Sequence, residues 1–190
     1  MCVLFCAAVT SPKMAVFQGS FSESVPFLKQ PTNLDGSLPG DVGFEPLGFS
    51  EVFDVKVLRE AELKHGRIAM LAWLGLVVPD FVRIPGERYS FEAIPNVLDA
   101  HDKLNGAVGV NMQVLFWIGI VELCCAKKVF EWNSLETAGD YGLTAFFPKD
   151  EEGQKRMRLA ELKNGRLAMV AFGGAITQAV ITRHPFPWLY

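Results

Sequence analysis

The sequence is short of the residues that catalytic and metal sites need. It has three histidines and four cysteines in 190 residues. His65, His101 and His184 are too widely spaced to suggest a metal cluster built from protein side chains alone. The cysteines, at positions 2, 6, 124 and 125, have the spacing of neither a zinc site nor a disulfide framework. Because no Ser-His-Asp arrangement, Cys-His arrangement or phosphate-binding loop stands out either, we expect a protein that is not an enzyme.

An excess of charge of one sign is also missing. The formal net charge is −3, and no basic stripe interleaved with aromatic residues is present, which argues against a nucleic-acid partner. Hydrophobic residues make up 50% of the chain, although 21% of it is charged. The apolar residues must therefore be concentrated in a few stretches.

Three stretches have the pattern of long helices, at about 54–79, 106–127 and 155–182. The 20 residues 107–126 contain a single acid, Glu122, and a run of this length matches the ~30 Å hydrocarbon core of a bilayer. The first stretch has only 11 uninterrupted apolar residues, 68–78, and alone would suit a buried helix of a soluble protein. The length and composition of the second stretch favour a membrane protein over a soluble one. We expect an all-α membrane protein with three transmembrane helices, the first and third pointing the same way.

An internal repeat relates the first and third stretches. The segment Arg59–Ala72 returns as Arg158–Ala171, 99 residues later, with Glu, Gly, Arg, Ala and Met in register. The same offset relates the turn Gly40-Asp-Val-Gly43 to Gly139-Asp-Tyr-Gly142. A duplicated loop followed by a helix predicts that the first and third helices cross and are related by a pseudo-two-fold axis.

Each copy of the repeat carries an acid and a base that cannot pair within one helix. Glu62 and Arg67 are five residues apart, as are Glu161 and Arg166, which separates them by about 140° around the helix axis. An unpaired ion facing hydrocarbon costs at least ~2.5 kcal/mol. The arrangement that satisfies both copies is a crossed exchange, Glu62 with Arg166 and Glu161 with Arg67. Small residues would permit the close approach that this exchange requires: Gly66, Ala69, Gly165 and Ala168.

The repeated acids have a second potential use. A glutamate neutralised by an arginine keeps a free oxygen lone pair, and His65 and Asn164 stand three residues after Glu62 and Glu161 on nearly the same helix face. Such oxygen and nitrogen donors suit the magnesium of a chlorophyll. Two plainer alternatives stay open: the glutamates form an interhelical clamp without a ligand, and His65 is a hydrogen-bonded packing residue. Asparagine at the second position argues against acid–base chemistry.

At these motifs the chain resembles the chlorophyll-binding light-harvesting proteins of plastids. The segments Glu62–Met70 and Glu161–Met169 carry the resemblance, which extends over about residues 20–190. The short loops and the tail Phe186–Tyr190 look more like the red-lineage branch, which includes fucoxanthin or peridinin chlorophyll a/c proteins and red-algal-type photosystem I antennae. The resemblance implies a single antenna domain over residues 15–190, whereas residues 1–14 have the character of a targeting remnant.

The resemblance also implies roles for individual residues. Arg67 and Arg166 would be the crossed ion-pair partners. The chlorophyll magnesium ligands would be Glu62, His65, Glu161, Asn164 and Gln178, with Gln113 and Glu122 on the middle helix as the remaining helix ligands. A bland alternative for Gln113 is a hydrogen bond between helices. His184 does not have the spacing of the family's C-terminal ligand, so no role is assigned to it.

Loops and aromatic side chains complete the expected pigment site. In the family, loops beginning at positions equivalent to Asp41 and Asp140 hold the ends of carotenoids, although each residue would equally suit an ordinary turn or cap. Four aromatic residues in or beside the helices would contact pigment rings, or else lipid and core: Trp73, Phe116, Trp117 and Phe172.

The resemblance implies an antenna in the plastid thylakoid membrane. Its cofactors would be chlorophyll a with chlorophyll c, and carotenoids such as fucoxanthin, peridinin or diadinoxanthin. Its partners would be thylakoid lipids, neighbouring antenna subunits and a photosystem core, with photosystem I favoured. Lysine and arginine are concentrated in the second loop, which places that loop and the N-terminus on the stromal side. Two alternatives differ in function: a photoprotective quencher of the same fold, and a small proton or ion transporter that uses Glu62, Glu161 and Glu122.

Overall fold

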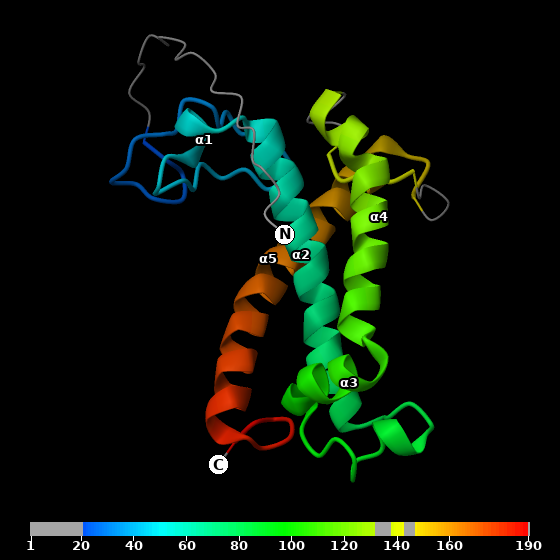
Figure 1. The fold of residues 1–190 in the computed structure, drawn as a ribbon. Coiled ribbons are helices and arrows are strands. Elements are labelled where there is room, and N and C mark those ends of the chain that lie inside the picture. The colour runs from blue at the N-terminus through cyan, green and yellow to red at the C-terminus, as the bar shows by residue number, and fades with distance from the viewer. Residues whose placement is uncertain (1–20, 132–137, 143–146, 190) are drawn as a thin grey trace. The chain divides into compact units, whose positions relative to one another are not determined.

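The computed structural model describes residues 21–131, 138–142 and 147–189, and its regular elements in these ranges are helices (Figure 1). Phe21 and Lys29 add one isolated antiparallel bridge. The expectation of an all-α chain is confirmed for these ranges, while residues 1–14 lie outside them. The α-helices are α1 (Phe49–Val52), α2 (Val55–Val77), α3 (Ala100–Val108), α4 (Val110–Glu131) and α5 (Glu151–Thr182), with short 3-10 helices at Val78–Asp80, Glu87–Tyr89 and Val97–Asp99.

Helix α5 is long and apolar enough to cross a membrane. A second candidate arises if residues 97–106 and 110–126, which are bent by 87° relative to each other, form one broken span. Helix α2 does not qualify by composition, since it carries six charged residues: Lys56, Arg59, Glu60, Glu62, Lys64 and Arg67. By length and composition, the described residues thus contain one helix that could cross a membrane, or two if the bent pair forms a single span.

The bend before α4 begins at a glycine. Gly109 has a φ of +61°, in the left-handed region, and its N–H donates to the Asn105 carbonyl 3.0 Å away, which ends α3. Helix α4 then starts at Val110, with the Gln113 N–H donating to the Gly109 carbonyl at 2.9 Å. The helix expected from about residue 106 therefore begins four residues later, because Gly109 interrupts the apolar run that the sequence presents as continuous.

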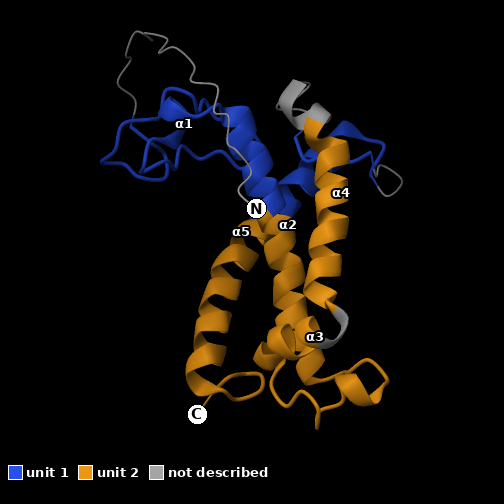
Figure 2. Ribbon diagram, viewed as in Figure 1, with its two compact units in different colours: residues 1–64, 129–163 blue, residues 65–128, 164–190 orange. Residues whose placement is uncertain are grey.

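The chain folds as two compact units, and the division falls inside both repeated motifs (Figure 2). Unit 1 comprises residues 1–64 and 129–163, and unit 2 comprises residues 65–128 and 164–190. Helices α2 and α5 each contribute their first part to unit 1 and their second part to unit 2.

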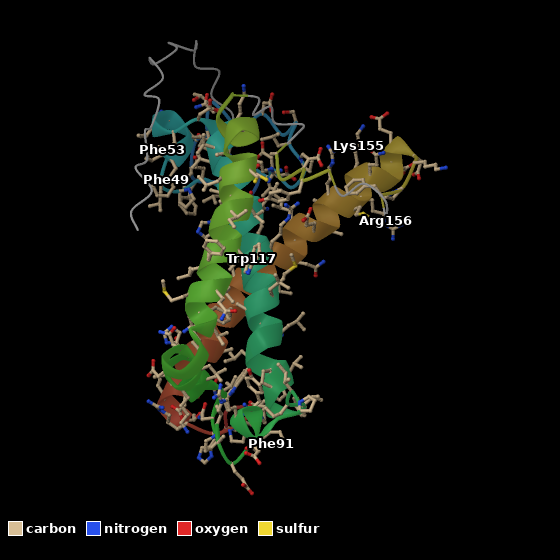
Figure 3. All side chains as sticks on the ribbon, turned by 45° about the vertical axis from the view of Figure 1, so that its right-hand side comes forward. Phe49, Phe53, Phe91, Trp117, Lys155 and Arg156 are labelled. Atoms are coloured by element: carbon tan, nitrogen blue, oxygen red, sulfur yellow. The ribbon has the colours of Figure 1, made fainter. Side chains whose placement is uncertain are left out.

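In unit 1, polar side chains fold the segment before α2 into turns. Ser22 Oγ donates to the Gly43 carbonyl at 2.6 Å, and Asn33 Nδ2 donates to the Ser50 carbonyl at 2.6 Å. The side chain of Ser50 donates to Glu45. The Phe49 and Phe53 rings lie near each other at α1, with centroids 6.5 Å apart (Figure 3). The segment expected to be loop with tight turns is therefore held mainly by side-chain-to-backbone hydrogen bonds.

Helix α5 begins earlier than the sequence pattern predicts. Asp150 Oδ2 accepts the Gly153 N–H at 2.7 Å, as an N-cap does, and the helix starts at Glu151 rather than near Lys155. Lys155 pairs with Glu151 at 2.7 Å, one turn away, and Figure 3 shows it beside Arg156 at this end of α5. Capping and this ion pair extend the helix into its polar first turn.

Unit 2 has a core that includes Trp188 of the C-terminal tail. Leu76 of α2, Ala175 and Ala179 of α5, and Trp188 of the tail are buried together. The Trp73 and Trp188 rings meet edge to face, with centroids 5.9 Å apart. Hydrogen bonds hold the tail: the Phe186 N–H donates to Asp80 Oδ2 at 2.8 Å, Asn96 Nδ2 donates to the Arg183 carbonyl at 3.1 Å, and Arg183 Nη1 donates to Asp99 Oδ1 at 3.4 Å. The tail thereby closes one end of unit 2.

Replacing Trp188 by alanine should destabilise unit 2 by about 3 kcal/mol, because Trp188 is 4% exposed and its removal leaves a cavity against Trp73 and Leu76. The measurement is thermal unfolding followed by circular dichroism in detergent. Leu189→Ala is the matched control, since Leu189 is 62% exposed. An equal loss in both variants would show that Trp188 does not anchor the tail.

Candidate functional site

The first motif lies on α2, which Asp54 begins by accepting the Lys56 N–H at 2.9 Å through its side chain. Glu62 is half-buried in unit 1, and its Oε2 lies 2.8 Å from Nη1 of Arg59, one turn earlier. In unit 2, His65 is exposed and Arg67 is half-buried. The helix thus presents a carboxylate held by an arginine, followed by an exposed imidazole.

The second motif lies on α5. Glu161 is half-buried in unit 1, beside Leu162, which is 3% exposed. In unit 2, Asn164 is exposed and Arg166 is half-buried, as are their equivalents His65 and Arg67. Gln178 is exposed near the end of the same helix. The residues that carry the donor atoms therefore have the same degree of exposure in both motifs.

This likeness extends along both helices within unit 2. The segments His65–Val78 and Asn164–Thr177 have the same pattern of burial. Each residue of the first segment falls in the same class, buried, half-buried or exposed, as the residue 99 positions later. Gly66 and Gly165 lie against each other: a methyl group on Gly66 would stand 3.0 Å from Cα of Gly165, and the reverse is equally close. The two helices meet at equivalent small residues, as the sequence predicts.

Beyond each donor lies an exposed apolar strip. Ile68 and Leu71 follow His65 and are 62% and 70% exposed, and their equivalents after Asn164, Leu167 and Val170, are 68% and 77% exposed. Exposed aliphatic side chains of this size need an apolar covering, either lipid or a bound group. A nitrogen or oxygen donor beside such a strip fits a large apolar ring with a magnesium ion at its centre.

Helix α4 combines polar and apolar exposure in the same way. Gln113 and Glu122 are both exposed. Leu115, Phe116 and Trp117 between them are 62%, 62% and 64% exposed. Figure 3 shows Trp117 on this helix. Phe116 and Trp117 are thus available to pigment or lipid, whereas Trp73 and Phe172 pack against the core of unit 2.

The two aspartate loops of unit 1 have the same local structure. The Gly43 N–H donates to Asp41 Oδ1 at 2.9 Å, and the Gly142 N–H donates to Asp140 Oδ1 at 2.7 Å. All four glycines of the loops have positive φ: Gly40 74°, Gly43 66°, Gly139 70° and Gly142 78°. The turn interpretation of both aspartates is therefore confirmed, and it leaves a role toward a carotenoid open.

The crossed ion pairs stay predictions. Glu62 and Glu161 belong to unit 1, and Arg67 and Arg166 belong to unit 2. Within unit 1, α2 makes two contacts that the sequence did not predict. Arg59 contacts Glu62, and Glu60 accepts a hydrogen bond from Gly139. The i, i+3 spacing of Arg59 and Glu62 was a signal for the first contact, whereas no local pattern announces the second.

Comparison with known proteins agrees with these motifs. A family model described as chlorophyll A-B binding protein matches residues 30–180. Among similar proteins, photosystem I chlorophyll a/b-binding protein 5 of Arabidopsis thaliana is 31% identical and covers 90% of this chain and 74% of its own. Fucoxanthin-chlorophyll a-c binding proteins of Chattonella marina var. antiqua and Phaeodactylum tricornutum are 36% and 38% identical. They cover 73% and 67% of this chain, which spans 65% and 68% of them.

The match includes both copies of the repeated motif and both aspartate loops. It confirms the resemblance drawn from the segments Glu62–Met70 and Glu161–Met169, and relatives from the fucoxanthin branch are among the similar proteins. The chain belongs to the chlorophyll a-b binding protein family.

Proposed function

We propose that this protein is a light-harvesting antenna of the plastid thylakoid membrane, which holds chlorophylls and carotenoids and passes excitation energy to a photosystem. The observation that carries the proposal is the pair of equivalent surfaces on α2 and α5. Each presents a donor, His65 or Asn164, beside exposed aliphatic side chains. A chlorophyll supplies light absorption and energy transfer when it is bound, and the protein supplies ligation and spacing.

The proposed magnesium ligands are the exposed or half-buried donors of the three long helices. They are Glu62 and His65 on α2, Glu161, Asn164 and Gln178 on α5, and Gln113 and Glu122 on α4. Carboxylate oxygens, amide oxygens and an imidazole nitrogen could each hold the magnesium of a chlorophyll. Arg59 Nη1 contacts Glu62 Oε2, so a guanidinium charge stands beside the carboxylate that is proposed as a ligand.

The proposed architecture has three membrane spans, formed by α2, α4 and α5. Helices α2 and α5 would cross about a pseudo-two-fold axis, with Glu62 paired to Arg166 and Glu161 to Arg67. The matching burial of His65–Val78 and Asn164–Thr177 supports this symmetry, as does the contact between Gly66 and Gly165. The crossed pairs would neutralise the charges that make α2 too polar to span a membrane by itself.

We further propose that the pigments are chlorophyll a with chlorophyll c, and carotenoids of the fucoxanthin type, whose ends rest at the Asp41 and Asp140 loops. The fucoxanthin-chlorophyll a-c binding relatives support this choice. The relative named as a photosystem I protein supports photosystem I as the energy acceptor. The second loop and the N-terminus would face the stroma.

The test is reconstitution of the full chain in detergent with a pigment extract that contains chlorophylls a and c and carotenoids. We expect a coloured complex in which light absorbed by the carotenoid produces chlorophyll a fluorescence. A folded but colourless protein that conducts ions in vesicles would overturn the proposal in favour of a transporter. A fluorescence lifetime that shortens on acidification would assign the complex to quenching rather than harvesting.

A further inference from the structure

Glu60 is the one acidic residue that is buried among the described residues, at 7% exposure. It belongs to α2 in unit 1, two residues before Glu62, and the repeated motif does not explain it. Its Oε2 accepts the Gly139 N–H at 2.6 Å, and its Oε1 lies 3.8 Å from Nζ of Lys64. Burying a carboxylate without such partners costs free energy, so the hydrogen bond and the nearby lysine account for the burial of Glu60.

The hydrogen bond joins parts of unit 1 that are far apart in sequence. Gly139 opens the second aspartate loop, 79 residues after Glu60, and it is buried with a φ of +70°. Asp140 follows directly and shapes the turn by accepting the Gly142 N–H. Glu60 therefore fixes the position of the loop in which Asp140 stands.

The first aspartate loop is anchored differently. The Arg59 guanidinium donates to the Pro39 carbonyl, just before Gly40. Asp41 Oδ2 also accepts the Gly36 N–H at 2.9 Å, and Ser22 holds the Gly43 carbonyl. The residue of α5 equivalent to Glu60 is Leu159, which has no side-chain acceptor. Two adjacent residues of α2 thus tether the two loops. Arg59 donates a hydrogen bond to the first loop, and Glu60 accepts one from the second.

We propose that Glu60 is a positioning residue that fixes the Gly139–Gly142 loop, and with it Asp140, to receive the end of one carotenoid. The proposal rests on the proposed function, in which this loop contacts a carotenoid. Since Glu60 bonds to the backbone of the Gly139–Gly142 loop, its loss should act on this loop. The first loop keeps Arg59 and its local hydrogen bonds.

The test compares wild type with Glu60→Leu, which installs the residue that α5 has at position 159, and with Glu60→Gln, which keeps a neutral acceptor. Glu92→Leu is the control, because Glu92 is an exposed acid outside unit 1. Amide hydrogen exchange is followed in peptides covering residues 138–142 and 36–43 of the reconstituted complex. Carotenoid and chlorophyll per chain are measured on the same samples.

In Glu60→Leu we expect exchange in residues 138–142 to rise by about tenfold or more, as loss of a hydrogen bond to a charged group predicts. Residues 36–43 should not change. Carotenoid per chain should fall while chlorophyll is retained. Glu60→Gln should show a few-fold rise in exchange and keep its carotenoid, because an amide oxygen still accepts the Gly139 N–H.

Equal exchange in residues 138–142 of wild type and Glu60→Leu, or carotenoid and chlorophyll lost in proportion, would overturn the proposal. If Glu60→Leu does not assemble, Glu60→Gln decides: faster exchange confined to residues 138–142 supports the tether, and wild-type exchange there overturns it. Failure of the proposed function is a separate result, since wild type would then bind no pigment whatever Glu60 does.

Discussion

Gly165→Leu is expected to leave little assembled protein. A methyl group at this position would already stand 3.0 Å from Cα of Gly66, and backbone atoms of the facing helix cannot turn aside as a flexible side chain can. Overpacking of a tight contact costs about 1–3 kcal/mol, and the branched leucine side chain exceeds a single methyl group by three carbons. Gly165→Ala should therefore give an intermediate loss of about 1–2 kcal/mol.

The measurement is the yield of coloured complex after reconstitution, together with its melting temperature. Gly174→Leu is the matched control on the same helix, because Gly174 is exposed and a Cβ there meets nothing within 4 Å. We expect this control to assemble as wild type does. Normal assembly of Gly165→Leu would mean that α2 and α5 do not meet at Gly66 and Gly165.

Reversing a charge in one of the proposed crossed pairs should be similarly damaging. Arg67→Glu would place a second carboxylate opposite Glu161, so that two like charges repel each other. Because both residues are half-buried, the loss should be smaller than the about 3–5 kcal/mol of a fully buried pair. Adding Glu161→Arg restores opposite charges and should recover assembly. This pair is the better choice because Glu62, in the other pair, also contacts Arg59.

The double variant Arg67→Glu, Glu161→Arg also distinguishes the structural role of Glu161 from its proposed role as a magnesium ligand. Arginine at position 161 has no lone pair for magnesium, so the rescued Arg67→Glu, Glu161→Arg complex should bind less chlorophyll than wild type. Arg67→Glu combined with Glu62→Arg is the mismatched control and should stay unassembled. Equal assembly of the matched and mismatched double variants would contradict the crossed arrangement.

Periodicity and the repeat predict the helices well, because both signals are local. The expected stretches 54–79 and 155–182 correspond to α2 at Val55–Val77 and α5 at Glu151–Thr182. The prediction errors lie at the helix ends, where a single side chain or a single backbone angle determines the residue at which a helix starts. Asp150 caps α5 earlier than its apolar pattern suggests, and Gly109 turns the backbone before α4.

Contacts between residues distant in sequence were the part that could not be predicted. Nothing near Glu60 indicates that it receives the Gly139 N–H, and nothing near Trp188 indicates that it enters the core beside Trp73. These contacts depend on the path of the chain after each helix, which brings Gly139 to Glu60 and Trp188 to Trp73. The repeat, in contrast, predicted a long-range approach at Gly66 and Gly165, because a two-fold relation places equivalent residues opposite each other.

In the proposed arrangement, α2 and α5 hold chlorophyll through Glu62 and Glu161, and an arginine of the other helix neutralises each of these carboxylates. An experimental structure of the pigment-bound protein tests it most directly. We expect a carboxylate oxygen of Glu62 and one of Glu161 to hold a chlorophyll magnesium, with Arg166 paired to Glu62 and Arg67 paired to Glu161. Chlorophyll absent from both glutamates, or either glutamate remote from its arginine, would contradict it.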